Sequence, residues 1–187
     1  MMTNHYFIAV QLNNELQSML SDWQEKLRKE NELKYKSWTS PDDLHITLKF
    51  LGGLEEDTIE LLKKKLLSIN TIHPFFIEIN GLGIFGNANQ PRVLWTGVEP
   101  SQGLFDLQKE VEKICVECGL KAENRPYRPH ITLAKKWKGE KINPTFIKEL
   151  SLDFIEKKDQ LVKDFVLYQI HPSRSPKYEV VQSVLLK

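Results

Sequence analysis

The stretch HITLKFLGG, residues 45–53, opens with a tetrapeptide that returns unchanged as HITL at residues 130–133, 85 residues further along the chain. Each copy follows a proline-containing segment, with Pro41 before the first and Pro126 and Pro129 before the second. Each copy also has β-forming neighbours and lies between stretches of helical periodicity. Identity over four residues proves little alone, but this matching context is what two related lobes, each of helices and strands, would produce.

Apolar periodicity predicts helices and strands around both copies. Helices are predicted over residues 13–30, 55–68 and 101–118, with a short one after Pro144. Strands are predicted over residues 6–12, 44–51, 75–79, 81–85, 93–98, 130–133, 152–155, 164–170 and 178–186. No linker rich in Pro, Gly or Ser divides the chain, so we expect an α+β fold in which residues 1–187 form one domain of two pseudo-symmetric lobes.

The composition is that of a folded globular protein, with 41% hydrophobic and 27% charged residues, which excludes a disordered or disulfide-stapled chain. Lys and Arg number 26 and Asp and Glu 25, a formal net charge of +1. This balance supplies no whole-molecule field for holding long nucleic acid, so a site for a polyanion must be local.

Neither the N-terminal region nor the cysteines suggest export or a metal centre. The first apolar run, residues 6–10, is too short for a signal sequence or a membrane span, so we expect a cytoplasmic protein that binds no membrane. We also expect a monomer. Cys115 and Cys118 form a C-x-x-C that could be redox-active or half of a zinc site. They fall late in a predicted helix without a second Cys/His pair nearby, which favours a structural role.

The two His-x-Thr pairs carry the chemistry. In a strand, residues i and i+2 share a face, so His45 projects with Thr47, and His130 with Thr132. Two lobes related by an approximate two-fold axis would bring both pairs to one cleft. Two histidines there could act as general base and general acid near neutral pH, and threonine hydroxyls could donate to an oxyanion. The alternatives are exposed polar decoration of two strands, or a metal site, for which no third ligand is apparent.

Three segments together resemble a known superfamily. HITLKFLGG (residues 45–53), PRVLWTGV (91–98) and RPYRPHITLAKKW (125–137) are similar to the two-histidine (2H) phosphoesterases, and most of all to their RNA 2',3'-cyclic phosphodiesterases, historically called 2'-5' RNA ligases. The resemblance implies a bilobal, LigT-like α+β fold with two antiparallel sheets flanked by helices around a central cleft. It also implies His45 as the proton donor and His130 as the proton acceptor that activates water.

The resemblance extends to the residues around the histidines. It implies that Phe50 and Lys135 flank the nucleobase, although the family commonly has arginine where this chain has Lys135, and lysine loses planar stacking. Residues 121–141 carry seven basic and two acidic side chains, and within them Tyr127 and Arg128 could combine stacking with charge toward RNA. Lys49 would share the face of His45 if its strand is regular.

The two histidines together with the resemblance predict a cofactor-free, metal-independent enzyme, and the resemblance implies that it hydrolyses 2',3'-cyclic phosphates of RNA ends or small nucleotides to a 2'-phosphomonoester. Thr47 and Thr132 would hold the nonbridging oxygens, and the reverse reaction would join RNA ends through a 2'-5' linkage. Two alternatives stay open. One is a phosphodiesterase for 2'-5' oligonucleotides or ADP-ribose cyclic phosphate, and the other is a nucleotide- or RNA-binding module without turnover.

Overall fold

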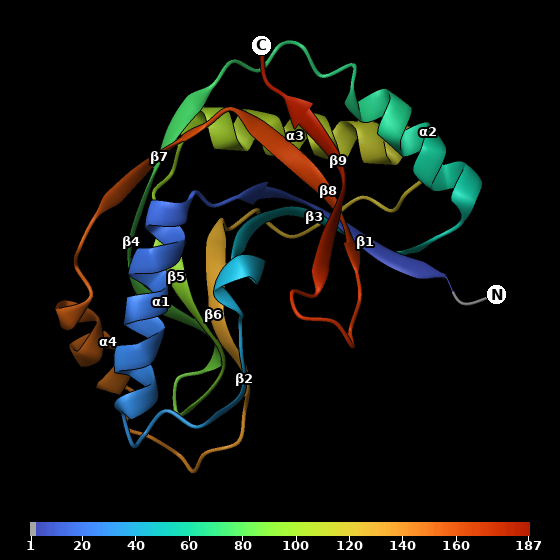
Figure 1. Cartoon of the computed structure of the whole chain (residues 1–187). Coiled ribbons are helices and arrows are strands. Elements are labelled where there is room, and N and C mark those ends of the chain that lie inside the picture. Colours follow the sequence, from blue (N-terminus) through green and yellow to red (C-terminus); the bar gives the residue numbers. More distant parts are fainter. Residues whose placement is uncertain (1–2) are drawn as a thin grey trace.

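A computed structural model describes residues 3–187 and shows two antiparallel sheets with helices packed around them (Figure 1). The elements are, in chain order, β1 (Asn4–Gln11), α1 (Asn14–Lys29), β2 (Tyr35–Trp38), the 3-10 turn η1 (Pro41–Asp43), β3 (His45–Leu54), α2 (Glu56–Leu66), β4 (Phe75–Asn87), β5 (Gln90–Val98), α3 (Gln102–Glu117), β6 (His130–Trp137), α4 (Phe146–Leu150), the 3-10 turn η2 (Ser151–Asp153), β7 (Lys158–Val162), β8 (Asp164–Ile170) and β9 (Tyr178–Leu185).

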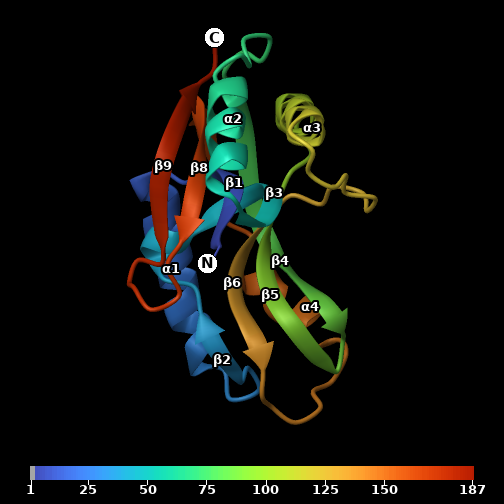
Figure 2. The same ribbon diagram turned by 90° about the vertical axis from the view of Figure 1, so that its right-hand side faces the viewer.

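Each copy of HITL begins a strand in a different sheet. The four-stranded sheet has the order β3-β1-β8-β9, and the five-stranded sheet has the order β2-β6-β5-β4-β7. Every strand pairing within them is antiparallel. The turned view in Figure 2 shows β3 of one sheet beside the start of β6 of the other, and these two strands contact each other. The antiparallel α+β arrangement predicted for the chain is thereby confirmed.

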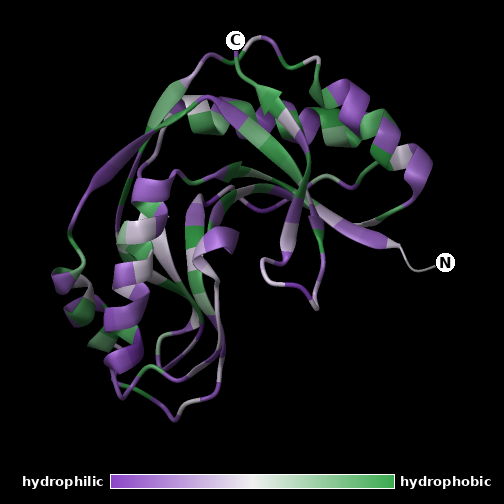
Figure 3. Cartoon of the chain, in the orientation of Figure 1, coloured by the Kyte–Doolittle hydropathy of each residue, from purple (hydrophilic) through white to green (hydrophobic). Residues whose placement is uncertain are grey.

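The three longer helices have buried apolar residues at helical spacing, and along them hydrophobic green alternates with hydrophilic purple in Figure 3. In α1 these residues include Leu16, Leu20, Trp23 and Leu27, all buried. Asn13 caps this helix, since its side chain accepts a hydrogen bond from the Leu16 N–H at 2.9 Å. One continuous hydrophobic cluster includes residues of both sheets and of α1, α2 and α3. Within residues 3–187, no helix combines the length and apolarity needed to cross a membrane.

The predicted helices and most predicted strands are confirmed, with three differences. Residues 75–79 and 81–85 are one strand, β4, because a register shift beside Gly81 lets it continue past Asn80. The strand predicted over residues 152–155 is wrong, since the 3-10 turn η2 occupies its first part. Strands β2 and β7 were not predicted, because YKSW and KDQLV are short and polar and lack a clear alternation.

Candidate active site

Both copies of HITL contain a β-bulge at the same position. In the first, Thr47 pairs with Ala9 and Lys49 with Ile8, which leaves Leu48 without an opposite residue. In the second, Thr132 pairs with Trp95 and Ala134 with Leu94, which leaves Leu133 unopposed. A bulge adds one residue to a strand and so reverses the alternation of the side chains that follow it.

The reversal decides which later side chains share a face with the histidines. Lys49 and Ala134 become core-facing, with 7% and 0% of their surface exposed. Phe50 lies opposite Phe7, whose ring contacts His45 at a centroid distance of 4.7 Å, and Phe50 is 62% exposed. Lys135 follows the second bulge in the same way and is exposed. The bulges therefore place Phe50 and Lys135 on the histidine faces.

His45 is fixed by its two neighbours in sequence. Its Nδ1 lies 2.7 Å from the carbonyl oxygen of Asp43, and a carbonyl can only accept, so Nδ1 carries the hydrogen. The remaining nitrogen, Nε2, lies 3.0 Å from the Thr47 hydroxyl. The ring packs between Phe7 and Tyr178, the latter at a centroid distance of 5.2 Å. Nε2 is therefore the nitrogen left for acid-base chemistry.

Burial lowers the pKa of His45 to about 4. The charges of His130 and Lys135 act in the same direction, whereas the bond to the Asp43 carbonyl and the Asp43 charge raise the pKa. His130 and Lys135 both belong to β6 of the other sheet, which contacts β3. With these surroundings His45 is neutral at pH 7.

His130 repeats this arrangement in the second sheet. Its Nδ1 donates to the Arg128 carbonyl oxygen at 2.7 Å, which again leaves Nε2 for chemistry. The ring meets Phe85 edge-on at 4.7 Å and lies 6.2 Å from Trp95. The Trp95 indole fits there because residue 83 is glycine, where a Cβ would come within 2.1 Å of the ring. Burial lowers the pKa of His130 as well.

The other predicted site residues, Thr132, Tyr127, Arg128 and Lys135, differ in their positions and contacts. Thr132 lies on the His130 face by strand alternation. Tyr127 is turned toward the first motif, where its hydroxyl donates to the Thr47 carbonyl at 3.0 Å, so it ties the two motifs together. Arg128 gives its carbonyl to His130 and leaves its side chain exposed. Partial burial and the charges of Lys177 and Lys136 lower the pKa of Lys135.

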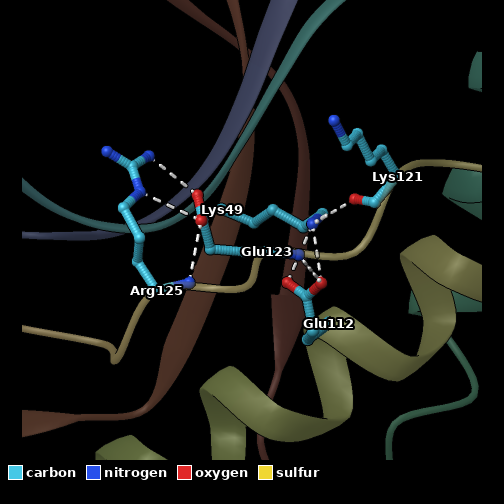
Figure 4. Close-up of polar contacts among 5 residues, drawn as sticks. All are labelled: Lys49, Glu112, Lys121, Glu123 and Arg125. Carbon is cyan, nitrogen blue, oxygen red and sulfur yellow. Dashed lines mark hydrogen bonds and ion pairs between the residues drawn. The ribbon is translucent and has the colours of Figure 1, made fainter.

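Lys49 would share the His45 face in a regular strand, but the strand is irregular, because the bulge at Leu48 turns Lys49 to the opposite side. Figure 4 shows its ammonium on the Glu112 carboxylate at 2.8 Å and on the Lys121 carbonyl at 3.0 Å. Glu112 also accepts from the Glu123 N–H at 2.8 Å. Lys49 therefore connects β3 with α3 and with the loop that precedes the second motif.

Several residues of the site were missed from the sequence. Phe7, Tyr168 and Tyr178 support His45 from β1, β8 and β9, and Phe85 supports His130 from β4. These contacts depend on strand register across distant parts of the chain. Asp43 could have been considered, because it stands two residues before His45 in the same position as Arg128 before His130.

Other parts of the described chain offer no comparable site. Among residues 3–187, no group of three or more His, Cys, Asp or Glu side chains is arranged to hold a metal ion. Cys115 and Cys118 are free thiols, and burial raises the pKa of Cys115 to about 12. A hollow of about 470 Å³ beside α1, lined by Asp22, Trp23 and Lys158 among others, includes none of the predicted site residues.

The paired motifs and the two sheets define a 2H phosphoesterase. The family model of the AKAP7 2'5' RNA ligase-like domain matches residues 4–184. The chain is 34% identical over 178 residues to the RNA 2',3'-cyclic phosphodiesterase of Bacillus subtilis (strain 168), covering 95% of this chain and 93% of that one. This chain therefore belongs to the RNA 2',3'-cyclic phosphodiesterase family of 2H phosphoesterases, a family of enzymes.

Two further comparisons agree with this membership. The RNA 2',3'-cyclic phosphodiesterase of Geobacillus stearothermophilus is 33% identical over 186 residues, which are 97% of this chain and 57% of that relative, so the chain spans little more than half of its length. The crystal structure of E. coli LigT complexed with 3'-AMP superposes with a TM-score of 0.77 at 23% identity, covering 100% of this chain and 99% of that one. The structural match shows a shared fold.

Proposed function

We propose that this protein hydrolyses 2',3'-cyclic phosphates at RNA ends or on nucleotides, leaving a 2'-phosphomonoester, with His45 and His130 as the acid-base pair. The observation that carries the proposal is that each histidine has its Nδ1 tied to the carbonyl two residues earlier. Each therefore has its Nε2 left for proton transfer, on two strands that contact each other. The names of the relatives that match over most of their length support the same substrate class.

The reaction follows from these two nitrogens. His130 Nε2 removes a proton from a water molecule while the water oxygen attacks phosphorus. The bond from phosphorus to O3' breaks as His45 Nε2–H protonates the departing O3'. Thr47 and Thr132 hydroxyls donate to the nonbridging oxygens, on which charge accumulates in the transition state. After each turnover His130 holds a proton and His45 lacks one, so solvent exchange restores the starting state. With a 5'-hydroxyl in place of water, the 5' oxygen forms the bond to phosphorus and the bond from phosphorus to O3' breaks, so the cyclic-phosphate end is joined through a 2'-5' linkage.

The nucleobase contact is weaker in this proposal than the phosphate chemistry. Phe50 offers an exposed ring beside His45, but Lys135 on the opposite motif has no planar group to stack on a base. We propose that the enzyme accepts RNA ends whatever their terminal base. We also propose that it acts as a monomer in the cytoplasm. The alternative is a protein that binds nucleotides or RNA without turnover, and hydrolysis of any cyclic phosphate would exclude it.

The product tests the proposed orientation. Incubation with adenosine 2',3'-cyclic phosphate should yield only adenosine 2'-monophosphate, because in-line attack with fixed acid and base permits efficient cleavage of one of the two ester bonds. Phosphorus NMR or isomer-resolving chromatography identifies the product. A dominant 3'-monophosphate would reverse the assumed orientation, and absence of turnover on cyclic mononucleotides and cyclic-ended RNA would reject the proposed function.

Metal independence is a separate expectation. Because two histidines move both protons, incubation with excess EDTA should leave kcat and KM unchanged within experimental error. Turnover of the cyclic nucleotide before and after removal of EDTA by gel filtration provides the measurement. Loss of activity that returns with added zinc or manganese would contradict the mechanism.

The pH dependence follows from the lowered pKa values of both histidines. In the free enzyme the base must be neutral and the acid protonated, so kcat/KM is bell-shaped and peaks between the two pKa values. Both lie below the ordinary value of 6.5, and that of His45 is about 4. The optimum of kcat/KM should therefore fall below pH 6.5, with a decline of about tenfold per pH unit on the alkaline side. A plateau extending above pH 8 would contradict this expectation.

A further inference from the structure

The two motifs are nearly equivalent except for the residue two positions before each histidine. Asp43 and Arg128 both accept the Nδ1 hydrogen of their histidine through the main-chain carbonyl, at 2.7 Å in each case. Their side chains are opposite in charge and in position. Asp43 is buried, with 4% of its surface exposed, whereas Arg128 is exposed. The electrostatic surroundings of the two histidines therefore differ at this pair of residues.

The Asp43 carboxylate is held by main-chain groups and keeps its charge unpaired. It accepts from the Lys177 N–H at 3.0 and 3.1 Å and from the Tyr178 N–H at 3.2 Å. In the part of the chain that the structure describes, no lysine, arginine or histidine side chain forms an ion pair with it. The same bonds fix the start of β9, whose Tyr178 ring packs edge-on against His45. A buried carboxylate without an ion-pair partner among the described residues thus lies beside one histidine only, and its charge also acts on Lys135 of the second motif.

We infer that Asp43 breaks the near symmetry of the site in favour of proton donation by His45, opposing the burial that keeps this ring neutral at pH 7. Asp43 is a positioning residue, since it acts through His45: its carbonyl fixes which ring nitrogen is available, and its carboxylate favours the protonated ring. This inference rests on the proposed acid-base function.

The charged and titratable groups around His45 decide how this works. Asp43 raises the pKa of His45, His130 and Lys135 lower it, and Phe7, Tyr168 and Tyr178 face the ring without charge at neutral pH. For His130 the bond to the Arg128 carbonyl is the one influence that opposes burial. Burial has a larger effect on the pKa of His45 than the charge of Asp43. A bound phosphate monoanion adds a second negative charge near His45. Because Asp43 already favours the positive charge of a protonated His45 ring, the phosphate has to stabilise that charge by less.

The experiment removes the charge of Asp43 and keeps its shape. In Asp43→Asn, the amide oxygen can still accept from the Lys177 and Tyr178 N–H groups. Nitrogen-15 NMR titration should show the pKa of His45 lowered by about 0.5 to 1 unit and that of His130 unchanged. With the cyclic nucleotide, kcat/KM on the alkaline limb should fall about 3- to 10-fold, since one pKa unit is a tenfold change in protonation. Asp42→Asn is the matched control, because Asp42 is the exposed neighbour in η1 and should leave both readouts unchanged.

A reciprocal variant covers the possibility that Asp43→Asn unfolds. Arg128→Asp places an acidic residue two positions before His130 on the exposed loop, and it should raise the pKa of His130. An unchanged His45 pKa in folded Asp43→Asn, or equal shifts of both histidines, would overturn the inference. If Asp43→Asn does not fold, an unchanged His130 pKa in Arg128→Asp would overturn it. The titrations need no substrate, so they test the effect of Asp43 on His45 independently of catalysis. If the wild-type protein fails to hydrolyse a cyclic phosphate, that result rejects the proposed function but not the effect of Asp43.

Discussion

Alanine in place of either His45 or His130 should reduce turnover of a 2',3'-cyclic nucleotide by about 10²- to 10⁴-fold, the usual contribution of one general acid or base. Each substitution deletes one half of a paired proton transfer that its partner cannot complete. The fold should persist, since each ring makes its hydrogen bonds within its own motif. Steady-state kinetics together with circular dichroism provide the measurement, and His5→Ala, an exposed histidine of β1, is the control.

The pH profiles of the residual activities also show which histidine is the general acid and which is the general base. Loss of the base should remove the acidic limb of the pH profile, and loss of the acid should remove the alkaline limb. We therefore expect His130→Ala to lose the acidic limb and His45→Ala to lose the alkaline limb. Retention of more than about a tenth of wild-type turnover by a folded variant would show that its histidine is neither acid nor base, because such groups contribute far more.

Lys49→Met should lower the free energy of unfolding by about 3 kcal/mol, because it strands a partly buried carboxylate without its cation. Glu112 keeps 21% of its side chain exposed and Lys49 only 6%. Glu112 would still accept the Glu123 N–H, but its negative charge would be uncompensated. Urea denaturation followed by circular dichroism gives the free energy of unfolding.

A double variant distinguishes the stranded charge from lost packing. Lys49→Met combined with Glu112→Gln should recover most of the loss, because no charge is left unpaired. Lys63→Met, in the exposed pair with Glu60, should cost no more than about 1 kcal/mol and is the control. Equal destabilisation in the single and the double variant would show that the aliphatic part of Lys49, and not its charge, stabilises the protein.

The repeat predicted two strands that each begin with a His-x-Thr pair on one face, because this depends on local alternation and on four identical residues, whereas the two antiparallel sheets were implied by the family resemblance. The repeat did not predict where Lys49 lies, since a bulge is decided by pairing with β1, a strand some 40 residues away in the chain. The aromatic rings that support the histidines were missed for the same reason. Asp43 was missed because a carboxylate in a 3-10 turn is ordinarily exposed, and it is buried here through bonds to residues 177 and 178.

The order of strands within the sheets has a consequence for protein synthesis. The first motif's sheet combines residues 4–11 and 45–54 with residues 164–170 and 178–185, and the second motif's sheet includes β2 and β7. Neither sheet is encoded by a contiguous half of the chain. Because a nascent chain emerges from its N-terminus, both histidines leave the ribosome before the strands that complete their sheets. The first motif's sheet therefore lacks two of its four strands until residues 164–185 have been synthesised.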